Sequence, residues 1–336
     1  MPSAFITGLA DPDLEDSERA FLRETRPAGI ILFARNCIAH DQIKRLVDDS
    51  LNAIGSDRAL VLIDQEGGRV QRLRPPLGRT LPNAAAYGGF YAADPEEACR
   101  LAALAARQTA EDLRALGINT NCAPVLDLPV AGAHDVIGNR AYGTTIEQVV
   151  ALGGAVAAGL MAGGVVPVIK HIPGHGRATA DSHHALPVVN TPRAELEATD
   201  FMPFRALAHL PAAMTAHVLF TSIDADKPAS TSSVVTELMR SDIGFDGLLM
   251  SDDVSMKALG GTFGERAAAV LAAGSDVVLH CNGNMEEMSA VAAACPELEG
   301  RPLARFETAM AVLQRREPFE PQLAEAAIAR VLSVAV

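Results

Sequence analysis

A short stretch of this sequence, residues 170–184, concentrates residue types that can do chemistry. It reads KHIPGHGRATADSHH and holds one lysine, four histidines and one aspartate. The apolar residues 165–169 (VVPVI) predict a buried strand before it, and Pro173, Gly174 and Gly176 predict that it begins as a loop. Imidazoles transfer protons near neutral pH and also bind metal ions, so the stretch predicts either acid–base catalysis or a metal site.

Ionisable residues also follow predicted strands in other parts of the chain. Together with the lysine of this stretch, they are Asp64, Asp127, Lys170, His217, Asp252 and His280. In a barrel of parallel strands the carboxyl ends share one face, and active sites form there. Ionisable residues at so many strand ends are hard to explain as scaffold, because a buried unpaired charge costs folding free energy.

These residues differ in how directly their positions indicate chemistry. Asp252 ends an apolar run and is predicted to point into the mouth of the fold. Asp127 fits a functional role and a tie for the following loop equally well, and Asp253 is interpreted as the cap of a following helix. His280 is interpreted as a buried structural histidine, and His175, between two glycines, as a brace for its loop.

Eight short apolar runs, separated mostly by helical patterns, predict the architecture. The predicted strands are residues 4–9, 29–33, 60–64, 118–126, 165–171, 212–218, 248–252 and 276–281. Strands that alternate with helices predict a parallel sheet, and eight such units favour a closed (β/α)₈ TIM barrel over an open doubly wound sheet. We expect residues 1–336 to form a single catalytic domain, with C-terminal helices in about residues 302–336 packed on the barrel.

The composition argues against several classes of protein. The chain has 336 residues, 49% of them hydrophobic, and a net charge of −13 without a lysine- or arginine-rich run, so neither nucleic acid nor a membrane is expected as a partner. No apolar run is long enough to span a bilayer, and we expect no signal peptide. The five scattered cysteines predict reduced thiols in a cytoplasmic protein.

Several motifs together resemble those of a known enzyme family. They are DQEGGRVQR (64–72), NCAPVLD (121–127), GNR (138–140), KHIPGHG (170–176), DSH (181–183) and SDDVSM (251–256). In this order they resemble glycoside hydrolase family 3, and more narrowly its bacterial β-N-acetylglucosaminidases of peptidoglycan recycling. The resemblance implies a (β/α)₈ barrel and a β-N-acetylhexosaminidase that acts with retention of anomeric configuration.

The resemblance also implies roles for individual residues. By position, Asp252 matches the family's nucleophile, and His183 matches its unusual general acid/base, with Asp181 as partner. The residues that match the binding site for terminal N-acetylglucosamine are Asp64, Arg72, Arg140, Lys170 and His171. Two positions depart from the family pattern: Ile172 replaces a phenylalanine, and Arg177 replaces a residue that is often acidic.

The chemistry of these residue types is compatible with such a mechanism. Retaining glycosidases normally use two carboxyl groups, and Asp252 supplies a nucleophile that is ionised at neutral pH. The unperturbed pKa of histidine, about 6.5, lets His183 donate a proton and then accept one, and Asp181 could fix its tautomer. The mechanism needs no metal and no cofactor. A metal-dependent barrel hydrolase is an alternative, with His171, His175, His183, His184 and Asp252 as candidate ligands, and so is a non-catalytic sugar-binding sensor.

The resemblance implies muropeptide fragments as substrates, with N-acetylglucosamine β-linked to anhydro-N-acetylmuramic acid. The absence of tryptophan and the presence of only three tyrosines also favour a small carbohydrate held by hydrogen bonds over a long polysaccharide stacked on aromatic rings. The small residues between Gly174 and Asp181 predict that a mobile loop delivers the acid/base. Peptide preference, phosphate as an alternative acceptor and oligomeric state are left open, with a monomer as the default.

Overall fold

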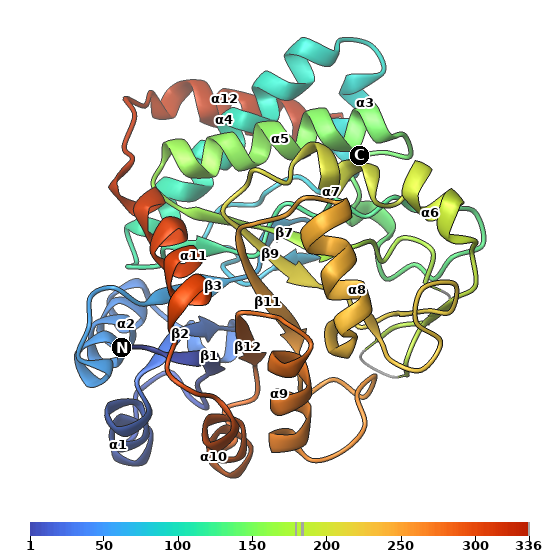
Figure 1. Ribbon diagram of the computed structural model, residues 1–336. Helices are drawn as coiled ribbons and strands as arrows, with labels where there is room; N and C mark the ends of the chain where they lie inside the picture. The colour runs from blue at the N-terminus through green and yellow to red at the C-terminus, as the bar shows by residue number, and fades with distance from the viewer. Residues whose placement is uncertain (179, 183–184, 335–336) are drawn as a thin grey trace.

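The computed structural model describes residues 1–178, 180–182 and 185–334. Within these residues, eight parallel strands close into a barrel that helices surround (Figure 1). The barrel strands are β1 (Ser3–Gly8), β2 (Pro27–Leu32), β3 (Leu60–Ile63), β6 (Thr120–Asn121), β7 (Val166–Ile172), β9 (Ala212–Thr215), β11 (Leu248–Asp253) and β12 (Val277–His280). Their order around the barrel is β1-β12-β11-β9-β7-β6-β3-β2, so the predicted (β/α)₈ barrel is confirmed.

Each predicted strand corresponds to one strand of this barrel, because a strand buried on both faces is a short continuous apolar run. The fourth strand is shorter than predicted. Its regular pairing stops at Asn121, because the Ala123 N–H turns back to the Asn121 carbonyl oxygen at 2.8 Å and Pro124 has no N–H to donate to the ladder. The segment still follows β7, and the Leu126 N–H donates to the Lys170 carbonyl oxygen at 2.8 Å.

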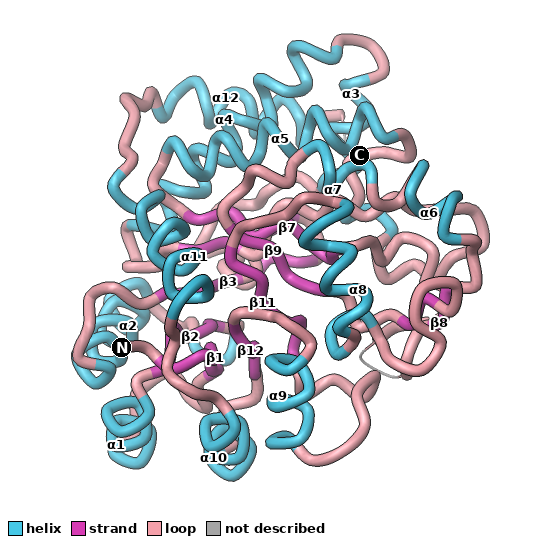
Figure 2. Tube along the Cα trace, viewed as in Figure 1, coloured by secondary structure: helices cyan, strands magenta, loops and turns pink. Residues whose placement is uncertain are grey.

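The helices form the outer layer, as the cyan segments around the magenta strands of Figure 2 show. They are α1 (Asp16–Thr25), α2 (His40–Ile54), α3 (Ala84–Tyr91), α4 (Pro95–Arg114), α5 (Ile146–Ala162), α6 (Arg193–Ala198), α7 (Met202–Ala206), α8 (Ser233–Glu237), α9 (Phe263–Ala272), α10 (Met285–Ala294), α11 (Gly300–Ala311) and α12 (Pro321–Leu332). Among the described residues, none of them combines the length and the apolar character that crossing a membrane requires.

Helices α4 and α5 show how local sequence sets this layer. The Asp94 side chain accepts the Glu97 N–H at 3.0 Å, and Pro95 occupies the first turn, so α4 begins at a capped end. Gly159 of α5 lies against α4, where a Cβ would be 2.3 Å from the Ala103 carbonyl oxygen. The two helices therefore pack at a distance that only glycine allows at this position.

Asp276 anchors the C-terminal part of the chain to the barrel. Helix α11 lies beside β11, and α12 packs on α4. The Asp276 carboxylate, in the turn before β12, is 2% exposed and accepts Arg305 Nη1 from α11 at 2.9 Å. It also accepts Arg240 Nη2 at 2.7 Å and the Leu249 N–H at 2.9 Å. One buried carboxylate thus joins three segments of the chain.

Replacing Asp276 with alanine should lower the free energy of unfolding by about 3–5 kcal/mol, because Arg240 and Arg305 lose a buried anionic partner. Chemical denaturation measures this loss. The matched control is Asp246→Ala, whose carboxylate also binds Arg305 but is 65% exposed, and which should cost less than about 1 kcal/mol. Equal losses in the two variants would contradict the anchoring role.

Candidate active site

A cavity of about 380 Å³ opens at the carboxyl ends of the barrel strands. The charged and histidine side chains that line it are Arg35, Asp64, Glu66, Arg72, Arg140, Lys170, His171, His175, Asp252 and Asp253. They come from the carboxyl-terminal residues of β7 and β11 and from the segments that follow β2, β3 and β7, with Arg140 from the long connection between β6 and α5. The barrel therefore gathers at one face residues that are far apart in the sequence.

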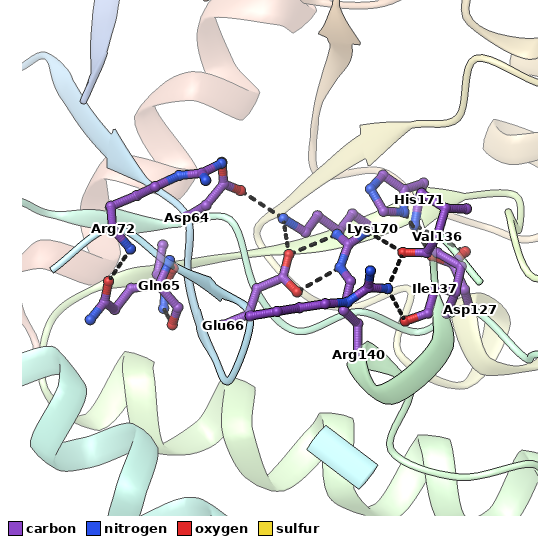
Figure 3. Close-up of polar contacts among 12 residues, drawn as sticks. Asp64, Gln65, Glu66, Arg72, Asp127, Val136, Ile137, Arg140, Lys170 and His171 are labelled. Carbon is purple, nitrogen blue, oxygen red and sulfur yellow. Dashed lines mark hydrogen bonds and ion pairs between the residues drawn. The ribbon is translucent and has the colours of Figure 1, made fainter. Parts of the chain in front are cut away.

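Lys170 lies at the centre of the site, with its side chain 3% exposed. Its Nζ donates to Asp64 Oδ1 at 2.8 Å and lies 2.6 Å from Glu66 Oε1, as Figure 3 shows. Burial by itself lowers the pKa of the ammonium group, but the two carboxylates outweigh burial and raise that pKa above its usual value. Lys170 is therefore charged at neutral pH.

Two arginines extend these contacts at either end. Arg72 Nη2 donates to Asp64 Oδ2 at 2.8 Å, and Arg140 binds Glu66 through Nε and Nη2, both at 2.8 Å. The result is an alternating ion-pair chain, Arg72–Asp64–Lys170–Glu66–Arg140. Burial raises the pKa of both carboxyl groups, but Lys170 and the arginines lower it by more, so both stay ionised at neutral pH.

A hairpin of β4 (Gln65–Gly67) and β5 (Val70–Gln71) sets the spacing of one half of this chain. Gln65 Oε1 accepts the N–H groups of Arg72 and Leu73 at 3.0 Å each, which closes the hairpin around one side chain. Gly67 has a φ of 106°, and a Cβ there would lie 2.2 Å from a backbone carbonyl oxygen. The hairpin returns the backbone to the end of β3, where the residues that flank it can pair.

Asp127 is fully buried and connects the segment after β6 to the loop after β7. Its Oδ2 lies 2.7 Å from His171 Nδ1, and its Oδ1 accepts the His175 N–H at 2.6 Å. Burial raises the pKa of Asp127, but His171 and the other donors lower it by more. Because an ionised carboxylate only accepts hydrogen bonds, His171 Nδ1 carries a proton and Nε2 is the ring nitrogen left for other partners.

Asp252 stands near the end of β11 and lines the same cavity. Its Oδ1 accepts the Asp253 N–H at 2.8 Å. Burial raises the pKa of Asp252, but the His217 and His171 rings and this N–H lower it by more, so the net shift is downward. Asp252 is therefore an ionised carboxylate at neutral pH, held beside the ion-pair chain.

His217 holds the backbone beside Asp252. Its Nε2 donates to the Asp253 carbonyl oxygen at 3.0 Å, and its Nδ1 lies 2.7 Å from Ser230 Oγ. A carbonyl oxygen only accepts, so the proton of the neutral ring is on Nε2. Burial lowers the pKa of His217, which keeps the ring neutral. The ring thus fixes the backbone next to Asp252.

The interpretation of Asp253 as a helix cap is wrong. Its Oδ1 accepts the Ser255 N–H at 2.9 Å and the Cys281 N–H at 3.1 Å. The next helix, α9, begins only at Phe263. The carboxylate instead joins the end of β11 to the end of β12, a contact between neighbouring strands that the local sequence does not reveal.

The structure brings together six of the residues assigned to the site from sequence. They are Asp64, Arg72, Arg140, Lys170, His171 and Asp252. Asp181 is half-buried and is not among the residues that line the cavity, whereas the adjacent Ser182 is. His183 and His184 lie outside the described residues, so the pairing of His183 with Asp181 remains a prediction.

Sequence reasoning missed Glu66, which links Lys170 to Arg140. Its position two residues after Asp64 was the available signal, but only the hairpin turns it toward the cavity. His280 is fully buried outside the cavity lining, with Nε2 3.0 Å from Glu287 Oε2, which agrees with the structural role predicted for it. Among the described residues, no cluster of three or more His, Cys, Asp or Glu side chains is arranged to hold a metal ion.

Comparisons with known proteins place this geometry in context. Residues 6–315 match the glycosyl hydrolase family 3 N-terminal domain. A β-hexosaminidase of Chromobacterium violaceum is 39% identical over 324 residues, which cover 95% of this chain and 88% of the relative. A β-hexosaminidase of Alkalilimnicola ehrlichii is 40% identical over 282 residues, or 82% of this chain and 80% of the relative.

Two solved structures are similar over nearly the whole chain. NagZ from Neisseria gonorrhoeae in complex with N-trifluoroacetyl-D-glucosamine superposes with a TM-score of 0.87 at 31% identity, over 100% of this chain and 98% of that chain. A family 3 β-N-acetylglucosaminidase from Paenibacillus also gives a TM-score of 0.87, at 32% identity, over 99% of this chain and 67% of that chain.

His175 predicts a specific pH dependence of stability. Burial, and then the neighbouring His171, lower the pKa of His175 to about 4, below its value of about 6.5 in the unfolded chain. The unfolded state therefore binds the proton first, and the folded state should lose up to about 3 kcal/mol as the pH falls from 6.5 to 4. The free energy of unfolding, measured by denaturation at several pH values, should no longer show this pH-dependent loss in His175→Gln. In the control His209→Gln, at an exposed position, it should persist.

Proposed function

The chain belongs to glycosyl hydrolase family 3 and is a β-N-acetylglucosaminidase, and we propose that it removes terminal β-linked N-acetylglucosamine from muropeptide fragments in cell-wall recycling. The observation that carries this proposal is the ion-pair chain beside Asp252. It places fixed charges, already paired with one another, around a cavity that would hold a small sugar.

The free hydrogen-bonding positions of the ion-pair chain suit sugar hydroxyl groups. Two of the three Lys170 N–H bonds are directed at Asp64 and Glu66, which leaves one for a substrate. Asp64 accepts from Lys170 and Arg72, and its carboxylate has further lone pairs. A hydroxyl group needs a donor and an acceptor, and this cluster offers both at adjacent positions. These contacts support a binding role for the chain.

We assign the nucleophile to Asp252. In the first step one of its oxygens forms a bond to the anomeric carbon while the bond to the leaving oxygen breaks, which gives a glycosyl ester. The lowered pKa of Asp252 supports this role, because only the ionised carboxylate attacks. The positive charge that develops on the sugar ring is favoured by the same carboxylate at close range.

We assign the general acid/base to His183, oriented by Asp181. His183 would protonate the leaving oxygen in the first step. In the second step it would take a proton from water while the water oxygen bonds to the anomeric carbon and the ester bond to Asp252 breaks, and the two inversions together retain the configuration. Ser182, the residue between these two in the sequence, lines the cavity with Asp252, which supports delivery of this segment to the site. We place His171, oriented through Nδ1 by Asp127, among the groups that hold the sugar.

The setting of the enzyme is also part of the proposal. The five cysteines are all free, as suits a reducing compartment, and we place the protein in the cytoplasm. We propose that residues 1–336 act as a single barrel domain without a metal or cofactor. The N-acetylglucosamine analogue bound to the Neisseria gonorrhoeae structure supports a small carbohydrate as the ligand.

Asp252→Ala should lower kcat for every substrate by on the order of 10⁴-fold or more, because the covalent step has no nucleophile. Steady-state rates with an aryl β-N-acetylglucosaminide measure this. Added azide should restore turnover of the aryl substrate and give the α-glycosyl azide, since azide attacks from the side that the carboxylate vacates. A β-glycosyl azide, or near-normal activity without azide, would rule out Asp252 as the nucleophile.

His183→Ala should lower kcat/KM for a β-linked disaccharide by roughly 10²- to 10⁴-fold, because the unactivated leaving oxygen needs a proton. An aryl N-acetylglucosaminide with an acidic phenol needs much less help, so its first step should be slowed far less. Rates measured across a series of phenols test this difference. Equal losses on all of them would contradict the acid/base assignment.

A further inference from the structure

The loop after β7 is fixed at its start, before it reaches Asp181. The His134 N–H donates to the Ala178 carbonyl oxygen at 2.8 Å, and the Val130 N–H donates to the Gly176 carbonyl oxygen at 3.4 Å. A Cβ at Gly176 would lie 1.8 Å from the Leu128 carbonyl oxygen, so the backbone passes directly over that segment. Residues 174–178 are thus held on one side by the connection that follows β6.

Arg177 holds the same part of the loop on its other side. Its Nε donates to Asp200 Oδ2 at 2.7 Å, and its Nη2 donates to Thr199 Oγ1 at 3.1 Å. Its Nη1 lies 2.8 Å from Glu195 Oε1, and the arginine side chain is 17% exposed. All three guanidinium nitrogens therefore contact a single short segment of the chain.

The partners of Arg177 lie on α6 and on the two residues that follow it. Glu195 belongs to the helix, and Thr199 is its C-terminal cap. The Thr199 hydroxyl lies 2.7 Å from Asp200 Oδ2, so two groups converge on one carboxylate oxygen. Asp200 is 2% exposed, and a carboxylate so deeply buried needs a cation beside it. The arginine guanidinium supplies that cation.

We propose that Arg177 is a positioning residue for proton transfer: by clamping the start of the loop to α6, it fixes the point from which Asp181 and His183 are presented to the cavity. The proposal rests on the acid/base role assigned above to His183. Arg177 precedes His183 by six residues, whereas Ile172, the last residue of β7, precedes it by eleven. The backbone contacts of Gly176 and Ala178 hold this start on one side and Arg177 holds it on the other, while the Ser182 carbonyl oxygen accepts the Ala258 N–H at 3.3 Å.

A loop segment that is held on two sides can shift when one of the two sets of contacts is removed. Without Arg177 the loop keeps its backbone contacts to the segment after β6 but loses its contacts to Glu195, Thr199 and Asp200. Misplacement of a catalytic group by about 1 Å can cost on the order of 10²-fold in rate. Loss of the clamp should consequently harm the step that needs a proton from His183 and leave attack by Asp252 largely intact.

Arg177→Met tests the clamp, because it keeps an apolar stem and removes the charge. We expect kcat/KM for a β-linked disaccharide to fall by roughly 10- to 100-fold, and that for an aryl N-acetylglucosaminide with an acidic phenol to change by less than about three-fold. Arg177→Lys, which restores the charge, should recover part of the loss. Equal losses on both substrates would overturn the proposal, as would no loss on either.

Arg193→Met is the matched control. Arg193 is also on α6 and also binds two carboxylates, Glu197 at 2.6 Å and Asp242 at 2.7 Å, but none of these three residues belongs to the loop. Its kinetics should stay within about two-fold of the parent chain on both substrates. A leaving-group-dependent loss in this control would show that the α6 surface, and not the clamp, is responsible.

A double variant separates positioning from folding. Arg177→Met with Asp200→Asn removes both charges, so no buried carboxylate is left unpaired and Tm should return toward that of the parent chain. The leaving-group-dependent loss should remain, because the loop is still unclamped. Full recovery of disaccharide hydrolysis in this variant would show that Arg177 acts only by neutralising Asp200.

His183→Ala distinguishes failure of this inference from failure of the proposed function. If His183→Ala shows the leaving-group dependence and Arg177→Met does not, only the clamp is refuted. If His183→Ala shows no such dependence, the acid/base assignment fails, and the clamp proposal fails with it.

Discussion

The structure of the site depends on one buried cation, Lys170. An ammonium group taken out of water costs several kcal/mol unless anions lie beside it. Asp64 and Glu66 meet that requirement, and each then needs a second cation, which Arg72 and Arg140 supply. The resulting chain has three cations and two carboxylates, and Asp252 nearby provides the third negative charge.

The barrel makes this arrangement possible, because the ends of strands that are far apart in the sequence meet at one face. The cost of burying the charges is met by their mutual pairing before any ligand binds, so a sugar would encounter donors and acceptors already in place. Asp127 and Asp253 extend the same principle to the backbone, since each ties two neighbouring segments at the rim of the cavity.

The strands and most of the site were predictable because each depends on local sequence. Apolar runs mark the strands, and motif residues such as Asp64, Lys170 and Asp252 directly follow them. The contacts of Glu66 and Asp253 were not predictable, because Glu66 pairs with Lys170 of β7 and Arg140 after β6, and Asp253 accepts the Cys281 N–H after β12. A contact of that kind depends on strand order and register, which a single sequence does not state. The role of Arg177 was likewise hidden until α6 could be placed beside the loop.

The ion-pair chain also limits which substitutions the site can accept during evolution. Each interior member has two partners of opposite charge, so replacing any one of them removes two ion pairs in a place that water reaches poorly. A single substitution within the ion-pair chain therefore gives a less stable protein, whereas the exposed ion pairs of the outer helices can be exchanged one at a time. Lys170, Asp64, Glu66 and the two arginines would therefore tend to be inherited as a block.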